Sequence, residues 1–210
     1  MQSTSMIEAL SARVRRSLPE PVWHQTFVVE EGRGVSFEQC TLTLLHADPT
    51  VPEGRGDSER VRRELRWLAA SQGGRVDHSA APSSLTMFKN PRAALRMALA
   101  LQNAVADVQF RVGLYTGHCT LALFQAQERQ WALVVGAERK HAAAMAWNAV
   151  AGTVALSAGA HQALGADLTD EVAGAMVSEE FDGGALVQAT VILPPRPTAF
   201  QSSFAGLGLT

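Results

Sequence analysis

The order in which short apolar strand patterns and amphipathic helix patterns alternate constrains this chain more than any other feature. A run of β-branched and aliphatic residues at 40–47 predicts the first strand. The patterns that follow are a helix at 57–70, strands at 75–79 and 85–88, an apolar helix at 93–105 and a long strand at 110–123. This order, βαββαβ, predicts an α+β fold with a ferredoxin-like core, in which helices pack on an antiparallel sheet.

The chain continues past this core with further sheet and helix patterns. We expect strands at 131–135, 153–156 and 186–193, and helices at 138–150 and 158–164. Asn90 followed by Pro91 predicts a capped start for the apolar helix. We also expect an interruption of the long strand at Thr116-Gly117, and a proline-containing loop at 48–54.

Four arginines occupy one face of the helix expected at 57–70, and Glu59 stands four residues before Arg63. Such a spacing favours an ion pair along the helix. A solvated helix face is the favoured interpretation, with an anion or partner patch as the alternative.

Both ends of the chain carry apolar side chains that suggest contacts. Ser5 and Glu8 form a capping box, and the narrow apolar stripe behind them predicts a helix that pairs with its copy or docks on the domain. We divide the chain into an N-terminal helix (1–22, a candidate dimerisation segment), a main domain (23–194) and a flexible tail (195–210). The candidate partner-binding residues are Ile7, Leu10, Val14, Phe200 and Phe204.

Composition excludes several classes of partner. The net charge of −2 gives no global basic field, so we expect neither a nucleic-acid nor a membrane partner. The uncharged stretch 142–166 is rich in Ala and Gly and is not expected to span a bilayer. Cys40 and Cys119 lack the number and spacing of a disulfide framework, so a reducing cytoplasm is expected.

Several short strings stand in a specific order along the domain. Among them are Leu44-Leu-His-Ala-Asp48, Gly73-Gly-Arg-Val76, the helix at 91–102, Arg111-Val-Gly-Leu-Tyr-Thr-Gly117 and Gly152-Thr-Val-Ala-Leu-Ser157. Together they resemble the class III nucleotidyl (adenylate/guanylate) cyclase catalytic domain. The resemblance implies a dimer whose sites use two carboxylate-held metal ions, a purine-reading pair, and an Asn and an Arg on one helix.

Most of the positions that the resemblance marks as reactive hold other residues here. The first metal position falls on Asp48, which could be a relic ligand or a turn residue. The second metal position is Pro82, the purine-reading positions are His78 and Leu133, and the Asn and Arg positions are Lys140 and Ala144. We therefore expect a degenerate member with no catalytic residues and no cofactor.

These observations favour one function and leave two alternatives open. We expect a catalytically inactive cyclase homology domain that acts by binding, as a homodimer with a protein partner. A divergent cyclase with rearranged ligands would need a further carboxylate near Asp48, for which Asp77 and Glu138 are candidates. The third interpretation is a sensor that binds a nucleotide or another small ligand in the cleft where the cyclase family binds its substrate.

Overall fold

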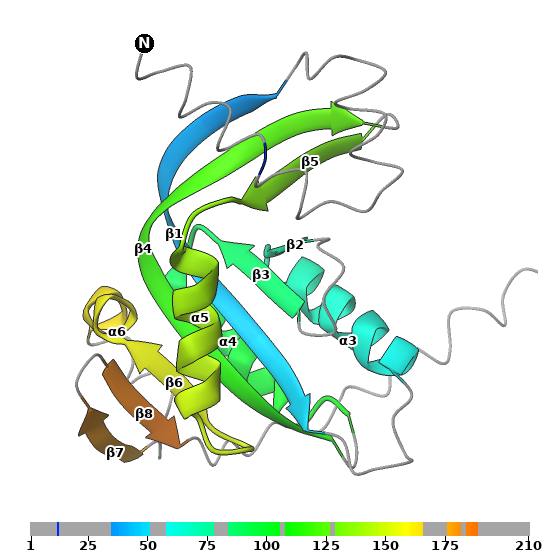
Figure 1. The fold of residues 1–210 in the computed structure, drawn as a ribbon. Coiled ribbons are helices and arrows are strands. Elements are labelled where there is room, and N and C mark those ends of the chain that lie inside the picture. The colour runs from blue at the N-terminus through cyan, green and yellow to red at the C-terminus, as the bar shows by residue number, and fades with distance from the viewer. Residues whose placement is uncertain are drawn as a thin grey trace, which may run out of the picture.

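A single sheet with helices on both faces forms the body of the domain (Figure 1). The computed structural model describes residue 12 and residues 35–50, 58–77, 84–105, 108–126, 129–165, 176–181 and 184–188. The sheet order is β2-β3-β1-β4-β6-β8-β7, and β5 pairs with β4 beside this path. All the strand pairs are antiparallel except β4 with β6. The expected α+β fold, including the ferredoxin-like order of its first four strands, is confirmed.

The described residues form eight strands and four helices. The strands are β1 (Ser36–Thr50), β2 (Arg75–Asp77), β3 (Ser84–Phe88), β4 (Gln109–Ala126), β5 (Arg129–Val134), β6 (Val154–Ser157), β7 (Met176–Phe181) and β8 (Gly184–Gln188). The helices are α3 (Ser58–Ser71), α4 (Pro91–Leu101), α5 (Glu138–Asn148) and α6 (Ala158–Leu164).

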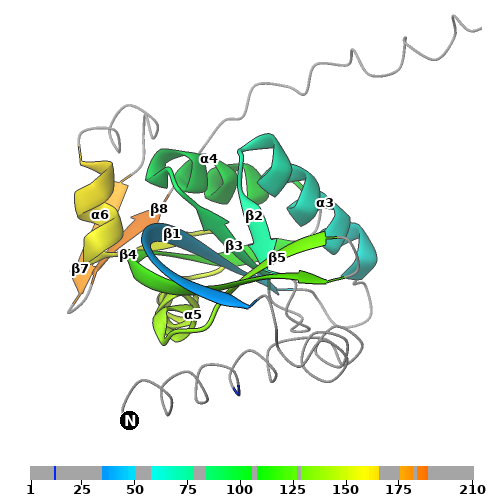
Figure 2. The same ribbon diagram turned by 90° about the horizontal axis from the view of Figure 1, so that it is seen from above.

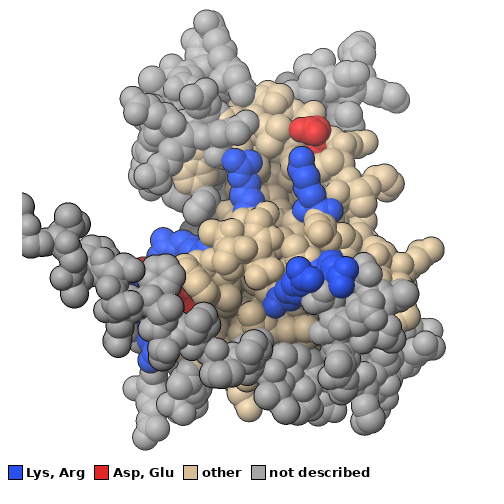
Figure 3. Space-filling view, turned by 180° about the vertical axis from the view of Figure 1, so that it is seen from behind, with Lys and Arg blue, Asp and Glu red and all other residues tan. Residues whose placement is uncertain are grey.

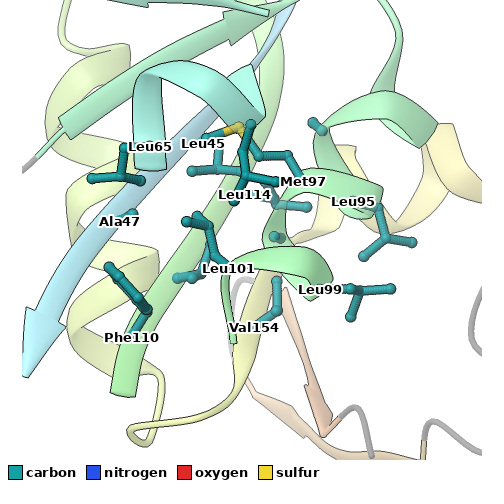
Figure 4. Packing of buried hydrophobic residues seen from close by; sticks show 14 of the residues in the cluster. Leu45, Ala47, Leu65, Leu95, Met97, Leu99, Leu101, Phe110, Leu114 and Val154 are labelled. Atoms are coloured by element: carbon teal, nitrogen blue, oxygen red, sulfur yellow. The ribbon is translucent and has the colours of Figure 1, made fainter. Parts of the chain in front are cut away.

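The two faces of the sheet are covered by different helices. Seen from above, α3 and α4 lie on one side and α5 lies on the other (Figure 2). Alternation along β1 sends Leu45 and Ala47 into the core below α3 and α4, and sends Leu44 into the cluster that contains Ala142 of α5. The larger core, in which Leu95, Met97 and Phe110 are completely buried, lies under α3 and α4 (Figure 4).

Local signals placed the start of α4 correctly but not its end. Asn90 caps α4 as predicted, because its side-chain oxygen accepts a 2.9 Å hydrogen bond from the backbone N–H of Arg92. The helix itself ends at Leu101, four residues before the predicted end. There the side-chain amide of Gln102 turns to the carbonyl oxygens of Phe110 and Thr153.

Two sequence predictions for the long strands are wrong. β1 continues through Asp48 and Pro49 to Thr50, where a loop was expected, because β4 pairs with it along its whole length. Proline is accepted there because β3 pairs with β1 only as far as Ala47, which leaves the other edge open. β4 also runs uninterrupted through Thr116 and Gly117, which lie opposite residues of β1.

Other differences between the predicted and the observed structure are smaller. Glu59 forms ion pairs with Arg66 (2.8 Å) and Arg62 (4.0 Å) in place of the predicted partner Arg63. The strand predicted at 186–193 is described as β8, over Gly184–Gln188, and β7 was not predicted. The sequence of β7 contains Ser-Glu-Glu, which has weak strand propensity, so its pairing with β8 is needed to define it.

The arginines of α3 lie on its exposed side, as expected for a solvated helix face. Arg62, Arg63 and Arg66 are all exposed. The face of the molecule opposite that of Figure 1 shows several basic side chains among mostly uncharged residues (Figure 3). Within the described ranges, no helix is long and apolar enough to cross a membrane.

Candidate functional site

Two of the carboxylates that the sequence singled out, Asp48 and Asp77, lie near the second half of β1, on the sheet face covered by α5. Strand pairing places Asp77, Leu85, His46 and Gly113 in one row across four strands. This row faces α5, because a Cβ atom on Gly113 would meet the backbone of that helix. Asp48 lies two residues further along β1 on the same face.

Asp48 is neither a turn residue nor a free carboxylate. It is the cross-strand neighbour of Arg111 in β4, and the two side chains form a partly exposed ion pair. Both sequence interpretations of Asp48 considered it alone, whereas the register of β1 against β4 supplies a guanidinium partner.

A second ion pair joins the sheet to α5. Asp77, whose side chain is completely buried at the end of β2, lies 3.2 Å from the guanidinium of Arg139, which is about a quarter exposed. A carboxylate buried this deeply requires a cation to offset its lost hydration. Asp77, one of the carboxylates that a rearranged metal site would need, is therefore engaged by Arg139.

His46 lies between these two pairs. Burial lowers the pKa of its imidazole, the charge of Asp48 acts in the opposite direction, and the charge of Arg139 lowers the pKa further. The neutral imidazole is therefore the stable form in the folded protein at neutral pH.

The first turn of α5 meets β4 through aromatic and carboxylate groups. The ring of His141 packs edge-on against Tyr115, with 5.3 Å between the ring centroids. Burial raises the pKa of the Tyr115 hydroxyl, and the neighbouring Cys119 and Glu138 raise it further. The charge of Glu138, the other carboxylate proposed for a rearranged site, thus adds to the rise that burial causes in the pKa of both Tyr115 and Cys119.

The structure places four of the six vestigial positions, and they belong to three different elements. Lys140 and Ala144 are exposed, one turn apart on α5, and Leu133 is completely buried in β5. Asp48 lies in β1, beside Arg111 of β4. His78 and Pro82 fall outside the described residues, as do the candidate partner-binding residues Ile7, Leu10, Val14, Phe200 and Phe204.

The described side chains do not fit the pair of metal ions that the cyclase fold implies. A hard divalent cation needs several oxygen ligands around one point. Asp48 and Asp77 are each paired with an arginine, and no three His, Cys, Asp or Glu residues among the described ones are arranged to hold a metal ion.

Comparisons with solved structures agree on one fold. The guanylyl cyclase Cya2 superposes with a TM-score of 0.56 at 16% identity, covering 76% of this chain and 96% of that one. The adenylyl cyclase CyaB from P. aeruginosa gives 0.55 at 16% identity, covering 74% and 96%. The dimeric guanylyl cyclase domain of the RhoGC fusion protein from the aquatic fungus Blastocladiella emersonii gives 0.57 at 12% identity, covering 73% and 98%.

These similarities define the class of fold. No protein-family model matches the sequence, and no curated protein matches it at a significant level. The chain has the fold of the class III adenylyl and guanylyl cyclase catalytic domains, so the resemblance seen in the sequence is confirmed for the fold.

Three contacts in and near the site were missed by the sequence analysis: Asp48 with Arg111, Asp77 with Arg139, and Cys40 opposite Cys119. Each joins residues that lie far apart in the sequence, and none is marked by a local motif. Only the pairing of two long strand patterns, counted residue by residue, could have indicated the first and the third.

Proposed function

We propose that this protein is a catalytically inactive nucleotidyl cyclase homology domain that acts by binding, as a dimerising and partner-binding signalling module. The observation that carries the proposal is the surface of α5. The resemblance to the cyclase family assigns the ribose-orienting Asn to Lys140 and the phosphate-stabilising Arg to Ala144. Both residues are exposed on this helix, and Ala144 offers only a methyl group.

The transition-state stabilisation lost through the replaced residues is large enough to favour an inactive domain over a slow enzyme. Removing one preorganised transition-state donor costs about 3–4 kcal/mol, which slows the reaction by roughly a hundredfold to a thousandfold. The assigned Asn, Arg and second metal ligand are replaced together, by Lys140, Ala144 and Pro82. Even with strong non-additivity, little rate above the uncatalysed reaction is expected.

The charges near Asp48 support the same conclusion. The remaining carboxylate at the first metal position faces Arg111, whose cation would repel a divalent metal ion. The buried Asp77 is held by Arg139. A rearranged cyclase would have to break both ion pairs before these carboxylates could bind metal.

A binding role is supported by the apolar groups that α5 exposes. Trp147 is 74% exposed at the end of this helix, and Val150 is 66% exposed just after it. Tryptophan is among the residue types that contribute most of the affinity at protein interfaces, so the exposed Trp147 is the candidate contact on this helix. The dimeric fungal guanylyl cyclase domain shows that a protein of this fold can self-associate.

Sedimentation velocity of the full chain over a range of concentrations tests the association. We expect a reversible dimer that Trp147→Ala weakens at least tenfold. Trp67→Ala is the matched control, because Trp67 is 61% exposed on α3, on the other side of the sheet, and should leave the dimer unchanged. A wild-type chain that stays monomeric at all concentrations, or equal effects of the two variants, would count against this role.

A thermal-shift panel of nucleotides separates this proposal from a ligand sensor. A ligand present at a hundred times its Kd would stabilise the fold by about 2.7 kcal/mol. We expect no shift with ATP, GTP or their cyclic products. A saturable shift with one nucleotide would replace the binding-module proposal with the sensor.

A further inference from the structure

The register of the two longest strands brings the chain's two cysteines face to face. Cys40 of β1 is the direct cross-strand partner of Cys119 of β4, although 78 residues separate them in the sequence. Directly opposite residues of an antiparallel pair project from the same face of the sheet. Both cysteines belong to the apolar cluster on the α5 side, in agreement with a shared face of the sheet.

The spacing of such a pair is close to that of a disulfide. Opposite residues in antiparallel strands have Cα atoms about 4.5–5.5 Å apart. Disulfides span about 4.4–6.8 Å between Cα atoms and prefer Cβ atoms about 3.8 Å apart, slightly closer than in an ordinary cross-strand pair. The bond can therefore form with a small approach of the two strands, and it should be readily reduced. Both thiols are free in the structure.

We propose that Cys40 and Cys119 form a reversible redox modification site, which a low-molecular-weight disulfide such as oxidised glutathione converts to a cross-strand disulfide. The Cys40 thiolate attacks one sulfur of the oxidant and releases one thiolate of glutathione. The Cys119 sulfur then attacks the Cys40 sulfur, loses its proton to solvent and displaces the second glutathione. The two cysteines lose two electrons together, and the oxidant becomes two molecules of free thiol.

The different exposure of the two thiols sets the order of these steps. Cys40 is partly exposed, whereas Cys119 is 1% exposed and its Sγ donates a weak hydrogen bond to the carbonyl oxygen of Gly117. Burial raises the pKa of the Cys119 thiol to about 12, and Glu138 and Cys40 add to this rise. Cys119 is therefore the resolving residue, and Cys40 meets the oxidant first.

The reaction at Cys40 should be slow at neutral pH and faster in alkali. Burial raises the pKa of this thiol, Glu38 raises it further, and the charge of Lys89 partly offsets them. Because the thiolate is the nucleophile, the rate should increase about tenfold between pH 7 and pH 8. The site thus responds to sustained oxidation and is a poor sensor of brief exposure.

Mass spectrometry of the folded full chain tests the proposal. The protein is incubated with oxidised glutathione, free thiols are blocked with N-ethylmaleimide, and the chain is cleaved with trypsin without reduction. We expect a cross-linked pair made of fragments 34–55 and 112–129, which hold one cysteine each. Dithiothreitol should separate this pair. The same cross-link should form in a monomeric preparation, so the result does not depend on the proposed dimer.

Variants separate this site from general thiol oxidation. Cys119→Ala should stop at a glutathione adduct on Cys40, and Cys40→Ala should leave the buried Cys119 unreacted. The register control combines Cys40→Ala with Thr41→Cys, which moves the thiol by one residue to the other face of β1, where no cross-link should form. Wild-type protein that gives only an adduct, only cross-linked dimers, or no reaction while circular dichroism shows it folded would overturn the proposal.

Discussion

Gly113 sets how closely α5 approaches the sheet, and its replacement by alanine is the sharpest test of the architecture around the site. A Cβ atom at this position would collide with the backbone of α5 at Ala142 and Ala146, and would lie 2.8 Å from the carbonyl carbon of Met145. Backbone atoms of a helix cannot rotate away as a side chain can. The whole helix must therefore shift, together with the ion pair between Arg139 and Asp77.

The expected cost follows from two opposing effects. Alanine is favoured over glycine within a strand by about 0.5–1 kcal/mol, because the unfolded chain loses less conformational entropy. Overpacking of a close contact costs about 1–3 kcal/mol, and the rigid backbone here favours the upper part of that range. We expect Gly113→Ala to destabilise the fold by about 1–2 kcal/mol, which lowers Tm by roughly 2–8 °C for a domain of this size.

Gly117→Ala is the matched control on the same strand and the same face. The three atoms nearest to a Cβ atom there all belong to the ring and hydroxyl of Tyr115, a side chain that can move. We expect Gly117→Ala to change the free energy of unfolding by less than about 1 kcal/mol. Urea denaturation followed by circular dichroism measures both values. Equal losses for the two variants, or no loss for Gly113→Ala, would refute this account of how α5 docks.

Three further predictions test separate parts of the structure. Arg139→Ala should destabilise the fold by ~3 kcal/mol, because it removes the cation beside the buried Asp77 carboxylate, whereas replacing both residues by leucine should restore most of the stability. Urea denaturation of the wild type, the single variant and the double variant measures this. A single variant as stable as the wild type would disprove the pairing. Asn90→Ala should cost about 1 kcal/mol and Asn90→Asp much less, because aspartate can also cap α4; equal losses would show that the cap contributes nothing. Because burial lowers the pKa of His46, the unfolded chain takes up a proton at this residue at a higher pH than the folded chain does. The free energy of unfolding should therefore fall as the pH drops below about 6.5. His46→Gln should flatten this part of a Tm-against-pH curve, and identical curves for the two proteins would contradict the burial argument.

The sequence predicted those parts of the fold that local chemistry determines. The helix α6 was predicted with the correct bounds, because Ser157 caps it at the end of an apolar strand pattern. The start of α4 was correct for the same kind of reason. Gly117 misled the strand prediction, since glycine usually weakens a strand, whereas here Leu42 of β1 pairs with it and holds β4 continuous.

The site was less predictable because its contacts depend on register. Asp48 and Arg111 meet only when fifteen residues of β1 pair with β4. Arg139 stands beside the exposed Lys140, yet its side chain turns to Asp77, which lies 62 residues earlier in the chain. Such contacts follow from the tertiary fold, and no spacing within one segment encodes them.

Product formation from nucleoside triphosphates tests the central claim most directly. The full chain is incubated with ATP or GTP and either Mg²⁺ or Mn²⁺, and cyclic nucleotide is measured by mass spectrometry against a working class III cyclase and a protein-free blank. We predict no cyclic AMP or cyclic GMP above the blank with either metal. Metal-dependent product that Asp48→Ala abolishes would contradict the claim, because it would show that this carboxylate leaves Arg111 to serve a working active site.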